Sequence, residues 1–462
     1  MAKAPDKEAA MRVRVHDVPV ALGPNHAEPE TLVMAVAERL KIRPTDVELV
    51  GISQRSIDAR RKPPRYRYAL DLELPDQLGG RLVRSGRANT PRIRTQRHYR
   101  FEKPYQGPRP VVVGAGPAGM FATLRLAEAG ARPILIERGK PVEERGRDVS
   151  RLYGKGELNP ESNVCFGEGG AGTYSDGKLY TRVGDDRIDH IMGMLVRFGA
   201  TPDILVNSRP HLGTDKLVRI LKTMRAAMID AGAEVHFGKR LTGIQTEGGA
   251  VKGVTLSAES IETDRLLLST GHSARGVWEQ LHSLGLPLEA RPFAVGFRIE
   301  HPQARIDQMR YGGYHRDLGL PSADYRLTYN EDHGDDRRGV YSFCMCPGGV
   351  VVTTPTEQGA LCINGMSHAS RSGRFANSAM VVTVGLQDFA DLGFDGVFAG
   401  ANFQRQVEER AFEAGGGMFT APAARVTDFL AGKASSSLGS TSYRRGITPA
   451  DIGTLYPGPI TE

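Results

Sequence analysis

The sequence predicts an α/β protein with three parts: a small α+β N-terminal domain, a domain built on a parallel sheet, and an antiparallel sheet inserted into that second domain. Apolar and polar residues alternate along much of residues 10–76, which is typical of strands with one buried face. A strand, a glycine-rich turn, a helix and a second strand follow one another over residues 111–137. From residue 290 to 429, short apolar runs alternate with turns, which is typical of antiparallel strands.

The N-terminal domain is predicted from its periodicity. Residues 11–15 and 66–74 alternate apolar and polar side chains, as strands do, and residues 47–57 predict a further strand. Residues 32–40 place an apolar side chain at every fourth position, which is the spacing of one helix face. The resulting β-α-β-β order predicts a ferredoxin-like layer, with helices on one face of an antiparallel sheet.

One β-α-β unit carries the strongest functional signal. The strand at 111–113 leads into Gly114, which allows a tight turn, and Gly119 lets the following helix lie close to the strand. Gly116 lets the backbone approach a pyrophosphate, which the free N–H groups of the helix N-terminus attract. Glu137 ends the second strand 23 residues after Gly114, where a carboxylate can accept hydrogen bonds from ribose hydroxyls. The alternative is a β-α-β unit that binds no nucleotide.

The helix of this unit is predicted to bury Ala122, Leu126 and Ala129 and to end at Gly130, a typical C-terminal capping residue. A glutamate at the end of the second strand fits FAD or NAD and disfavours NADP, whose 2′-phosphate it would repel. The glycine run at 167–172 follows no apolar strand. We therefore predict one dinucleotide-binding unit and no second one.

The rest of the parallel-sheet domain is predicted from weaker signals. Residues 139–185 form a long glycine-rich and charged loop, and a loop of that length is usually functional or disordered. A helix is expected at 207–232 and a short strand at 235–237. Residues 241–256 predict a hairpin that turns at Gly248-Gly249, and residues 266–271 predict a buried strand that ends on a small-residue turn.

Length and composition bound the class of protein. A chain of 462 residues with 40% hydrophobic residues is an ordinary multidomain globular protein. No stretch approaches the roughly 20 apolar residues of a membrane helix, and the first residues lack the apolar core of a signal peptide. Four cysteines do not make a disulfide framework, and no cysteine or histidine spacing predicts a metal site. We expect a cytoplasmic protein with no membrane partner.

The net charge of +7 is concentrated at one end of the chain. Residues 1–100 hold 20 Lys and Arg against 12 Asp and Glu, whereas the remainder holds 40 against 41. Such a segment can be a surface for a polyanion or a solvated basic linker. We favour the linker, because no nucleic-acid motif accompanies the charge. The excess is densest at Arg81, Arg84, Arg87, Arg92, Arg94, Arg97 and Arg100.

The pattern of residues 110–137 resembles the ADP-binding unit of FAD enzymes of the glutathione-reductase type. Three further stretches, Phe166–Leu179, Tyr341–Gly349 and Asn364–Arg371, together with Arg55–Arg60, are similar to those of uncharacterised bacterial FAD-dependent dehydrogenases (NAD(P)/FAD-dependent oxidoreductases) that carry a ferredoxin-like N-terminal domain. The resemblance covers nearly all of the chain. It implies a flavoprotein oxidoreductase with a glutathione-reductase-type FAD-binding Rossmann domain and an inserted antiparallel-sheet substrate domain, and it implies no particular substrate.

In this superfamily a C-terminal strand and a glycine-rich turn usually help to hold the FAD. Nothing after Phe429 matches that turn, so we expect a chain shortened at its C-terminus. The expected domains are a small basic α+β domain at 1–80, a basic linker at 81–109, the FAD-binding domain at 110–289, the inserted substrate domain at 290–430, and an incomplete start of the return to the FAD domain at 431–462.

The resemblance extends the predicted cofactor site beyond the β-α-β unit to the glycine-rich loop and to the turn after the last strand. The predicted cofactor-binding residues are Gly114, Gly116, Pro117, Ala118, Gly119, Glu137, Arg138, Gly170, Gly172, Thr173, Ser175, Asp176, Lys178, Thr270 and Gly271. Within the loop, Ser175 and Asp176 are expected to shape the backbone through local hydrogen bonds.

Two residues are candidates for catalysis. Lys178 could stabilise the negative charge of a reduced flavin, or it could simply close an exposed turn. Cys344 and Cys346 would share one strand face, so that Cys346 could be a reactive thiol near the flavin. We favour two small hydrophobes in a buried strand. His272 could lie at the flavin edge or on the surface.

The sequence therefore predicts an FAD-dependent oxidoreductase that passes hydride between a small-molecule substrate and flavin N5. Electrons could also come from a redox partner protein or from NAD(P)H bound transiently as a donor. The alternative is an RNA-associated flavoprotein whose N-terminal domain binds nucleic acid, which we do not favour.

Overall fold

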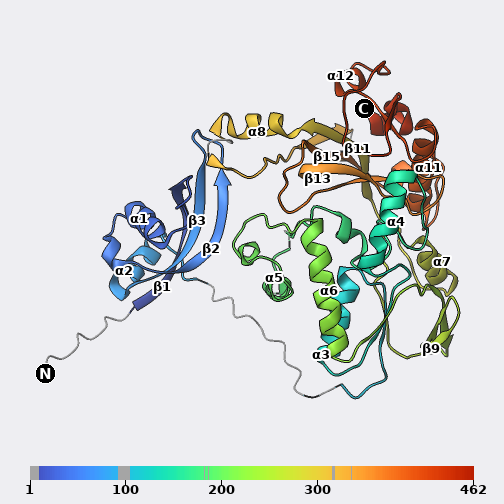
Figure 1. The fold of residues 1–462 in the computed structure, drawn as a ribbon, viewed down its shortest axis with the longest axis horizontal. Helices are drawn as coiled ribbons and strands as arrows, with labels where there is room; N and C mark the ends of the chain where they lie inside the picture. Colours follow the sequence, from blue (N-terminus) through green and yellow to red (C-terminus); the bar gives the residue numbers. More distant parts are fainter. Residues whose placement is uncertain are drawn as a thin grey trace. The chain divides into compact units, whose positions relative to one another are not determined.

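The computed structural model describes residues 10–91, 103, 105–179, 181, 183–185, 187–314, 318–333 and 336–462 (Figure 1). These residues form two compact units, and neither is one continuous stretch of chain. The first unit takes the described parts of Met1–Tyr99, Lys178–His211 and Arg305–Ala323. The second takes those of Arg100–Gly177, Leu212–Ala304 and Asp324–Glu462. Of the predicted basic cluster, Arg92, Arg94, Arg97 and Arg100 lie outside the described residues.

The first unit contains a three-stranded antiparallel sheet with the order β1-β3-β2. Its elements follow the predicted β-α-β-β order and add a second helix, and both helices pack on the sheet face that carries Val13, Val15 and Leu70. The strands and the first helix predicted for this domain are confirmed, while the ferredoxin-like assignment stays a prediction. The elements are β1 (Ala10–Ala21), α1 (Pro29–Leu40), η1 (Pro44–Asp46), β2 (Glu48–Asp58), β3 (Arg65–Pro75) and α2 (Asp76–Arg84).

Two later segments complete this first unit. The segment around α5 (Arg187–Arg197) and η3 (Pro202–Leu205) lies against the outer edge of β2. There the Arg55 guanidinium donates two hydrogen bonds to the side-chain oxygen of Asn207, at 3.0 and 2.8 Å. The other segment is the described part of Arg305–Ala323, which includes most of α8 (Gln303–Tyr311). The backbone carbonyl of Arg310 there accepts a hydrogen bond from Lys62.

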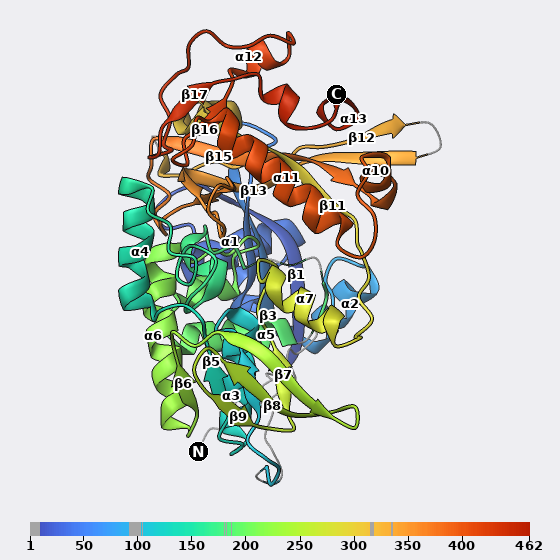
Figure 2. The same cartoon turned by 90° about the vertical axis from the view of Figure 1, so that its right-hand side faces the viewer.

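The second unit is built on a parallel four-stranded sheet with the order β10-β4-β5-β6. The strands are β4 (Val111–Val113), β5 (Ile134–Ile136), β6 (Glu234–His236) and β10 (Leu266–Leu268). The helices α3 (Pro117–Glu128) and α6 (Thr214–Asp230) lie side by side (Figures 1 and 2). The helix α4 (Val142–Lys155) also contacts α6. The predicted β-α-β unit is confirmed.

Several details of this domain differ from the predictions. The centre of the buried face of α3 is Thr123, whereas Ala122 and Leu126 are only partly buried. The reason is that Gly119 fixes which face meets the strand, and Thr123 stands one helical turn further along. Gly130, with φ of 76°, does end the helix region as predicted. The predicted helix at 207–232 begins only at Thr214, because Gly213 has φ of 77° and a side chain there would collide with Ala369.

The strand β10 was expected to be buried, and that expectation is wrong. Leu267 and Leu268 are each 36% exposed in the structure. The cause is topological, because β10 is the edge strand of the described sheet and pairs only with β4 there.

A small antiparallel sheet packs on the parallel one. It consists of β7 (Leu241–Glu247), β8 (Ala250–Leu256) and β9 (Ser260–Glu262). The predicted hairpin turn is confirmed at Gly248 and Gly249, whose φ angles of 57° and 77° are those that glycine adopts most readily. Apolar side chains of β7 and β8 join those of β4 and β5 in one core, and α7 (Arg275–Ser283) follows β10.

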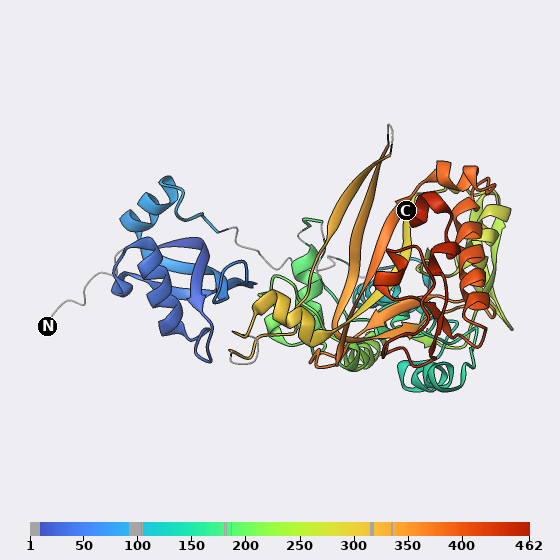
Figure 3. The ribbon, with the colours of Figure 1, turned by 90° about the horizontal axis from the view of Figure 1, so that it is seen from above.

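The predicted antiparallel region forms a five-stranded sheet with the order β11-β15-β13-β12 and with β14 paired to the far end of β13. The strands are β11 (Phe293–Pro302), β12 (Thr328–His333), β13 (Asp336–Thr353), β14 (Ile363–Met366) and β15 (Phe375–Val384). β12 and the first part of β13 run antiparallel and project beyond the rest of the sheet (Figure 3). That this sheet is an inserted substrate domain stays a prediction.

The remaining elements pack on this antiparallel sheet. α10 (Leu386–Asp391) and α11 (Ala399–Ala414) bury Phe389 and Phe403 against it, and Figure 2 shows α11 lying across its strands. The hydroxyl of Tyr456 donates to the carbonyl of Gly296 in β11 at 3.1 Å. The predicted return of 431–462 to the nucleotide domain stays a prediction. The last elements are β16 (Ala421–Ala423), α12 (Val426–Phe429), β17 (Ile447–Pro449), η4 (Ile452–Leu455) and α13 (Gly458–Thr461).

Within the described ranges no helix has the length and apolar character needed to cross a membrane. The cytoplasmic location stays a prediction.

Candidate functional site

The three glycines of the turn after β4 have different structural roles. Gly114 has φ of 102°, and a side chain there would collide with the carbonyl of Ser269. A side chain at Gly119 would collide with the carbonyl oxygen of Gly114. By contrast, a Cβ at Gly116 would meet no protein atom within 4 Å. Gly114 and Gly119 are thus required by the fold itself, whereas the space in front of Gly116 is open for a ligand.

Helix α3 directs its N-terminus at that space. Gly116 is the N-cap and Pro117 the first helical residue, and no side chain caps the helix. The N–H groups of Ala118 and Gly119 have no acceptor within the helix, as in the first turn of any α-helix. Their partial positive charge makes this end of α3 suited to a phosphate.

The carboxylate of Glu137 is hydrogen-bonded to backbone N–H groups of three separate segments. It accepts hydrogen bonds from the backbone N–H groups of Ala115 (2.8 Å), Gly139 (2.8 Å) and Gly167 (2.9 Å), and the residue is only 6% exposed. The sequence analysis predicted ribose binding alone and missed this structural role. The ribose contact stays a prediction beside it.

A cavity of about 930 Å³ opens at the carboxyl ends of the parallel strands. Parallel α/β sheets bind ligands at this edge, and pockets for cofactors have volumes of about 300–1,000 Å³. Four of the predicted cofactor residues, Gly114, Glu137, Arg138 and Thr270, line the cavity. Other parts of its wall come from residues 160–161, Phe166, residues 239–242, residues 273–274, α7 and residues 356–358.

Arg138 is held at the cavity wall by two contacts. Its guanidinium lies 4.1 Å from the ring centroid of Phe166, and its Nε donates to Glu161 at 2.9 Å. Gly271, which follows Thr270, has φ of 76° and is exposed, as is His272. A surface position for His272 was one of the two expected alternatives.

The predicted glycine-rich loop packs directly on the turn after β4. The N–H of Gly169 donates to the carbonyl of Ala115 at 2.7 Å, and a side chain on Gly170 would come within 3.2 Å of Gly116. Residues Gly170–Tyr174 form the short helix η2, so that Gly172 faces Pro117. The structure therefore brings the loop and the β-α-β turn together, as the predicted site requires.

A buried arginine that the sequence analysis missed holds this loop. Arg145 of α4 is fully buried, and burial lowers the pKa of its guanidinium. It donates to the backbone carbonyls of Asn163 (2.8 Å), Val164 (2.7 Å), Glu168 (2.6 Å) and Gly170 (2.9 Å), and to the hydroxyl of Thr173 (3.2 Å). No sequence signal could have found it, because most of its acceptors are backbone carbonyls.

Glu168 is a second buried charged group in the loop. Its carboxylate accepts hydrogen bonds from the N–H of Val142 (2.9 Å) and from Arg225 (2.8 Å). Burial nevertheless raises the pKa of Glu168, since desolvation outweighs these contacts.

Ser175 and Asp176 follow η2. The Ser175 hydroxyl donates to the carbonyl of Gly172 (2.7 Å) and accepts from the N–H of Gly177 (3.0 Å), which confirms the predicted local role. Asp176 differs, because its buried carboxylate pairs with the Arg371 guanidinium and accepts from the hydroxyl of Ser367. The prediction of local bonds missed these partners, which lie more than 190 residues away in sequence.

The two catalytic candidates are placed differently. Lys178 belongs to the first unit, where its backbone pairs with His211, and its catalytic role stays a prediction. Cys346 lies in β13, but Cys344 has φ of 48° and a bulge interrupts the register between Phe343 and Cys346. The expected strand alternation of the two cysteines is therefore wrong. The buried thiol of Cys346 lies 3.5 Å from the Arg298 guanidinium.

Among the described residues, no group of His, Cys, Asp and Glu side chains could hold a metal ion.

Comparison with known proteins agrees with this geometry. Residues 109–145 match an FAD-binding domain, residues 292–462 match a family described as "FAD-dependent protein, C-terminal domain-like", and residues 15–73 match a domain of unknown function. An uncharacterized protein of Clostridium beijerinckii is 37% identical over 460 residues, which span 98% of this chain and 84% of the relative.

The fold and the site thus define an FAD-binding protein of the α/β class. The chain belongs to the same family as the Clostridium protein, with FAD-dependent family domains at 109–145 and 292–462. FAD is its cofactor, and the open space at Gly116 together with the cavity beside Glu137 fits the group.

Solved structures similar to the chain are distant flavoproteins and other enzymes. Thermovibrio ammonificans THI4 is 17% identical, with a TM-score of 0.25 over 39% of this chain and 64% of that one. A Proteus vulgaris L-amino acid deaminase is 13% identical, with a TM-score of 0.28 over 54% and 71%. A halogenase, PltM, in complex with FAD is 12% identical, with a TM-score of 0.30 over 59% and 51%. At such scores nothing specific to those enzymes is carried over to this chain.

Proposed function

We propose that the protein is an FAD-dependent oxidoreductase, a dehydrogenase that acts on a small-molecule substrate. When bound, FAD supplies a two-electron centre at flavin N5 that can accept or donate hydride. The observation that carries the proposal is the pairing of an open helix N-terminus at Gly116 with a large cavity at the carboxyl ends of the same parallel strands. A structural β-α-β unit would need neither feature.

The chain's own residues would divide the work of holding the cofactor. The N-terminus of α3 would bind the pyrophosphate, and the glycine-rich loop would cover it, because the loop packs on Gly116 and Pro117. Glu137 would bind the ribose while keeping its backbone donors in place. Arg138, stacked on Phe166, would form the wall of the nucleotide half.

Cys346 remains a proposed group for the chemical step. Lys178 belongs to the first unit, and its stabilisation of the negative charge of a reduced flavin stays a prediction. For Cys346 to act as a nucleophile, its thiol must lose a proton, and the Arg298 guanidinium beside it is the positive charge that would favour the thiolate. Electrons would come from the substrate, from a redox partner protein, or from a transient NAD(P)H donor.

A pair of glycine variants tests the cofactor assignment. Gly116→Val should abolish flavin binding by filling the space of the pyrophosphate, yet leave the thermal midpoint of the flavin-free protein nearly unchanged, since a Cβ there meets no protein atom within 4 Å. The control is Gly154→Val in α4, where a side chain also meets open space. Flavin-to-protein ratios from absorption spectra give the answer. Full flavin content in Gly116→Val would contradict the proposal.

A separate experiment addresses the electron donor. An anaerobic screen of reductants on the native, flavin-loaded protein identifies which of them reduces the flavin.

A further inference from the structure

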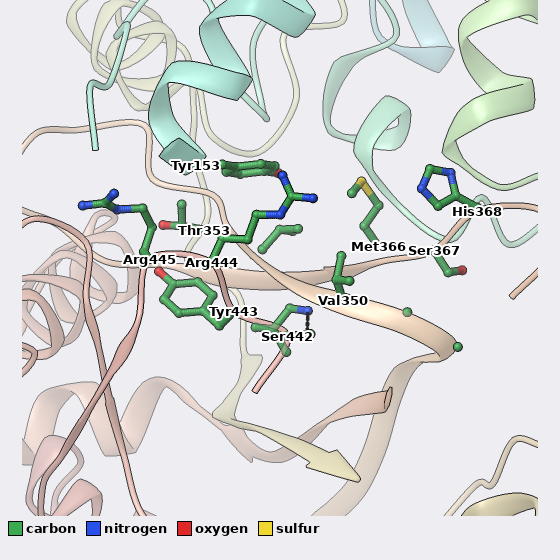
Figure 4. Close-up of a pocket in the computed structure, with 14 residues that line it drawn as sticks. Tyr153, Val350, Thr353, Met366, Ser367, His368, Ser442, Tyr443, Arg444 and Arg445 are labelled. Atoms are coloured by element: carbon green, nitrogen blue, oxygen red, sulfur yellow. Dashed lines mark hydrogen bonds between the residues drawn. The ribbon is translucent and has the colours of Figure 1, made fainter. Parts of the chain in front are cut away.

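A second, smaller cavity lies elsewhere in the second unit. It has a volume of about 150 Å³, which is about the size of a cavity that holds benzene. Its walls are the end of β13, the loop at 442–445 and Tyr153 of α4 (Figure 4). Val350 and Met366 give it an apolar side.

One hydroxyl group at this cavity has no partner among the described residues. The phenol oxygen of Tyr153 is buried and makes no hydrogen bond there. Leaving a buried polar group without a partner is costly, so such groups usually meet a ligand or water. Burial also raises the pKa of Tyr153, so its hydroxyl remains a proton donor at neutral pH.

Two arginines, Arg444 and Arg445, line the cavity, and no Asp or Glu is among its lining residues. His368 also lines it, with its Nδ1 3.9 Å from the carboxylate of Asp215. The Arg445 guanidinium is already bound to the carbonyls of Met418 and Gly154. The exposed Arg444, in contrast, has no ion pair within the described ranges, and Figure 4 shows its guanidinium beside Tyr153.

Two acids near the cavity wall have hydrogen-bond partners of their own. Glu300 accepts hydrogen bonds from the backbone and hydroxyl of Ser442. Asp176 pairs with Arg371 and accepts from Ser367. Ser367 lines the cavity, and its bond to Asp176 joins the cavity wall to the segment that follows the glycine-rich loop.

We propose that this cavity binds a small carboxylate with an apolar body. The carboxylate pairs with Arg444 and accepts a hydrogen bond from Tyr153, while the apolar body lies against Val350 and Met366. This binding does not depend on the proposed oxidoreductase function.

Calorimetry on the full-length, flavin-loaded protein tests the site with benzoate and its neutral isostere benzamide. We expect benzoate to bind at least tenfold more tightly than benzamide, because a charge-assisted hydrogen bond is worth about 1.5–3 kcal/mol and 1.4 kcal/mol is a factor of ten. Arg444→Gln and Tyr153→Phe should each weaken benzoate binding about tenfold. Arg410→Gln, which removes an exposed arginine of α11 away from the cavity, should not.

The outcomes separate this inference from the proposed function. If the protein holds flavin but does not bind benzoate, or binds benzamide equally well, the carboxylate site is refuted and the cofactor assignment stands. An unchanged affinity in both Arg444→Gln and Tyr153→Phe refutes it as well. If the purified protein holds no flavin, the proposed oxidoreductase function fails, and the same titration on that protein still decides whether the cavity binds a carboxylate.

Discussion

The sheet of the first unit and the glycine-rich loop of the second are stabilised in opposite ways. Beneath the sheet, Val13, Val15, Leu32 and Leu70 are fully buried in a core that consists mainly of aliphatic side chains. Beneath the loop, the largest fully buried side chain is the charged Arg145.

The contrast shows what each region is built to do. An apolar core is non-directional, so many side chains of similar volume satisfy it. A buried polar network is directional, and each missing partner leaves a group unsatisfied. The loop is therefore fixed in one conformation against the turn at Gly116, which a binding site for phosphates requires. The sheet needs only to stay folded.

The largest expected effect comes from removing the centre of the polar network. Arg145→Met leaves the carbonyls of Asn163, Val164 and Gly170 without their donors. We expect the free energy of unfolding to fall by about 3 kcal/mol or more, because each buried group left unsatisfied costs about 1–3 kcal/mol, and flavin content to fall with it. Denaturant unfolding and flavin-to-protein ratios measure both.

The matched control for this variant is Arg147→Met, which removes an exposed arginine from the same helix. It should leave both quantities unchanged. If both substitutions lowered the free energy of unfolding equally, the loss of a positive charge would explain the effect. The hydrogen bonds of Arg145 would then not be what stabilises the loop.

A core substitution in the first unit should cost a similar or somewhat smaller free energy. Leu70→Ala removes buried methyl groups from the centre of the β1-β3-β2 sheet, which typically costs about 2–5 kcal/mol. Leu70→Met conserves the volume and should cost less than about 1.5 kcal/mol. Amide hydrogen exchange in β1 and β3 reports the loss. A penalty for Met as large as that for Ala would show that this core is as specific as the polar network.

A smaller, pH-dependent effect is expected at Glu168. Its pKa is raised in the folded state, so the folded protein binds the proton more tightly than the unfolded chain. Stability is then lost as pH rises from the ordinary value of 4.5 through the raised pKa. Glu168→Gln keeps an acceptor for the N–H of Val142 and should flatten this dependence, with a gain in stability at neutral pH.

Unfolding curves between about pH 5 and 8 on both proteins measure this difference. If Glu168→Gln is instead less stable at every pH, the ion pair with Arg225 outweighs the burial of the carboxylate.

The smallest effect is expected at the basic residues of α2. Arg87, beyond the helix, is already engaged, because it donates to the carbonyl of Leu40 at 2.7 Å. We expect the full-length protein to show no selective RNA binding near about 0.15 M salt, and only weak retention that falls steeply with salt. Filter binding with the Arg81→Gln, Arg84→Gln double variant measures it. A selective complex at that ionic strength would favour the RNA-associated alternative.

Local patterns predicted the parts of the fold that depend on local physics. The alternation in β1 and β3 and the Gly248-Gly249 turn are properties of a few neighbouring residues, and both are confirmed. The exposed edge at β10 depends on which strands flank it in the sheet. The bulge at Cys344 depends on the register with β15. Neither of these can be read from a short window of sequence.

In the candidate site too, the residues that could be predicted depend on local sequence, and those that could not depend on tertiary packing. Gly114, Gly116, Gly119 and Glu137 were predicted because their spacing is set by one turn and two strands. Arg145 could not be, since its acceptors are mostly backbone carbonyls that every residue possesses. The distant partners of Asp176 depend on tertiary packing alone.

The pairing of Arg55 with the segment around Asn207 has a consequence for synthesis. Asn207 follows Arg55 by 152 residues, and the N–H and carbonyl of Arg55 bond to Val206 (2.7 Å) and Ser208 (2.9 Å). At about 5–20 residues per second, a ribosome needs roughly 8–30 s to deliver that stretch after β2 has emerged. During this interval the outer edge of β2 is open to pairing with other nascent chains. Translation speed between these two segments should therefore influence how much of the protein reaches its folded form in the cell.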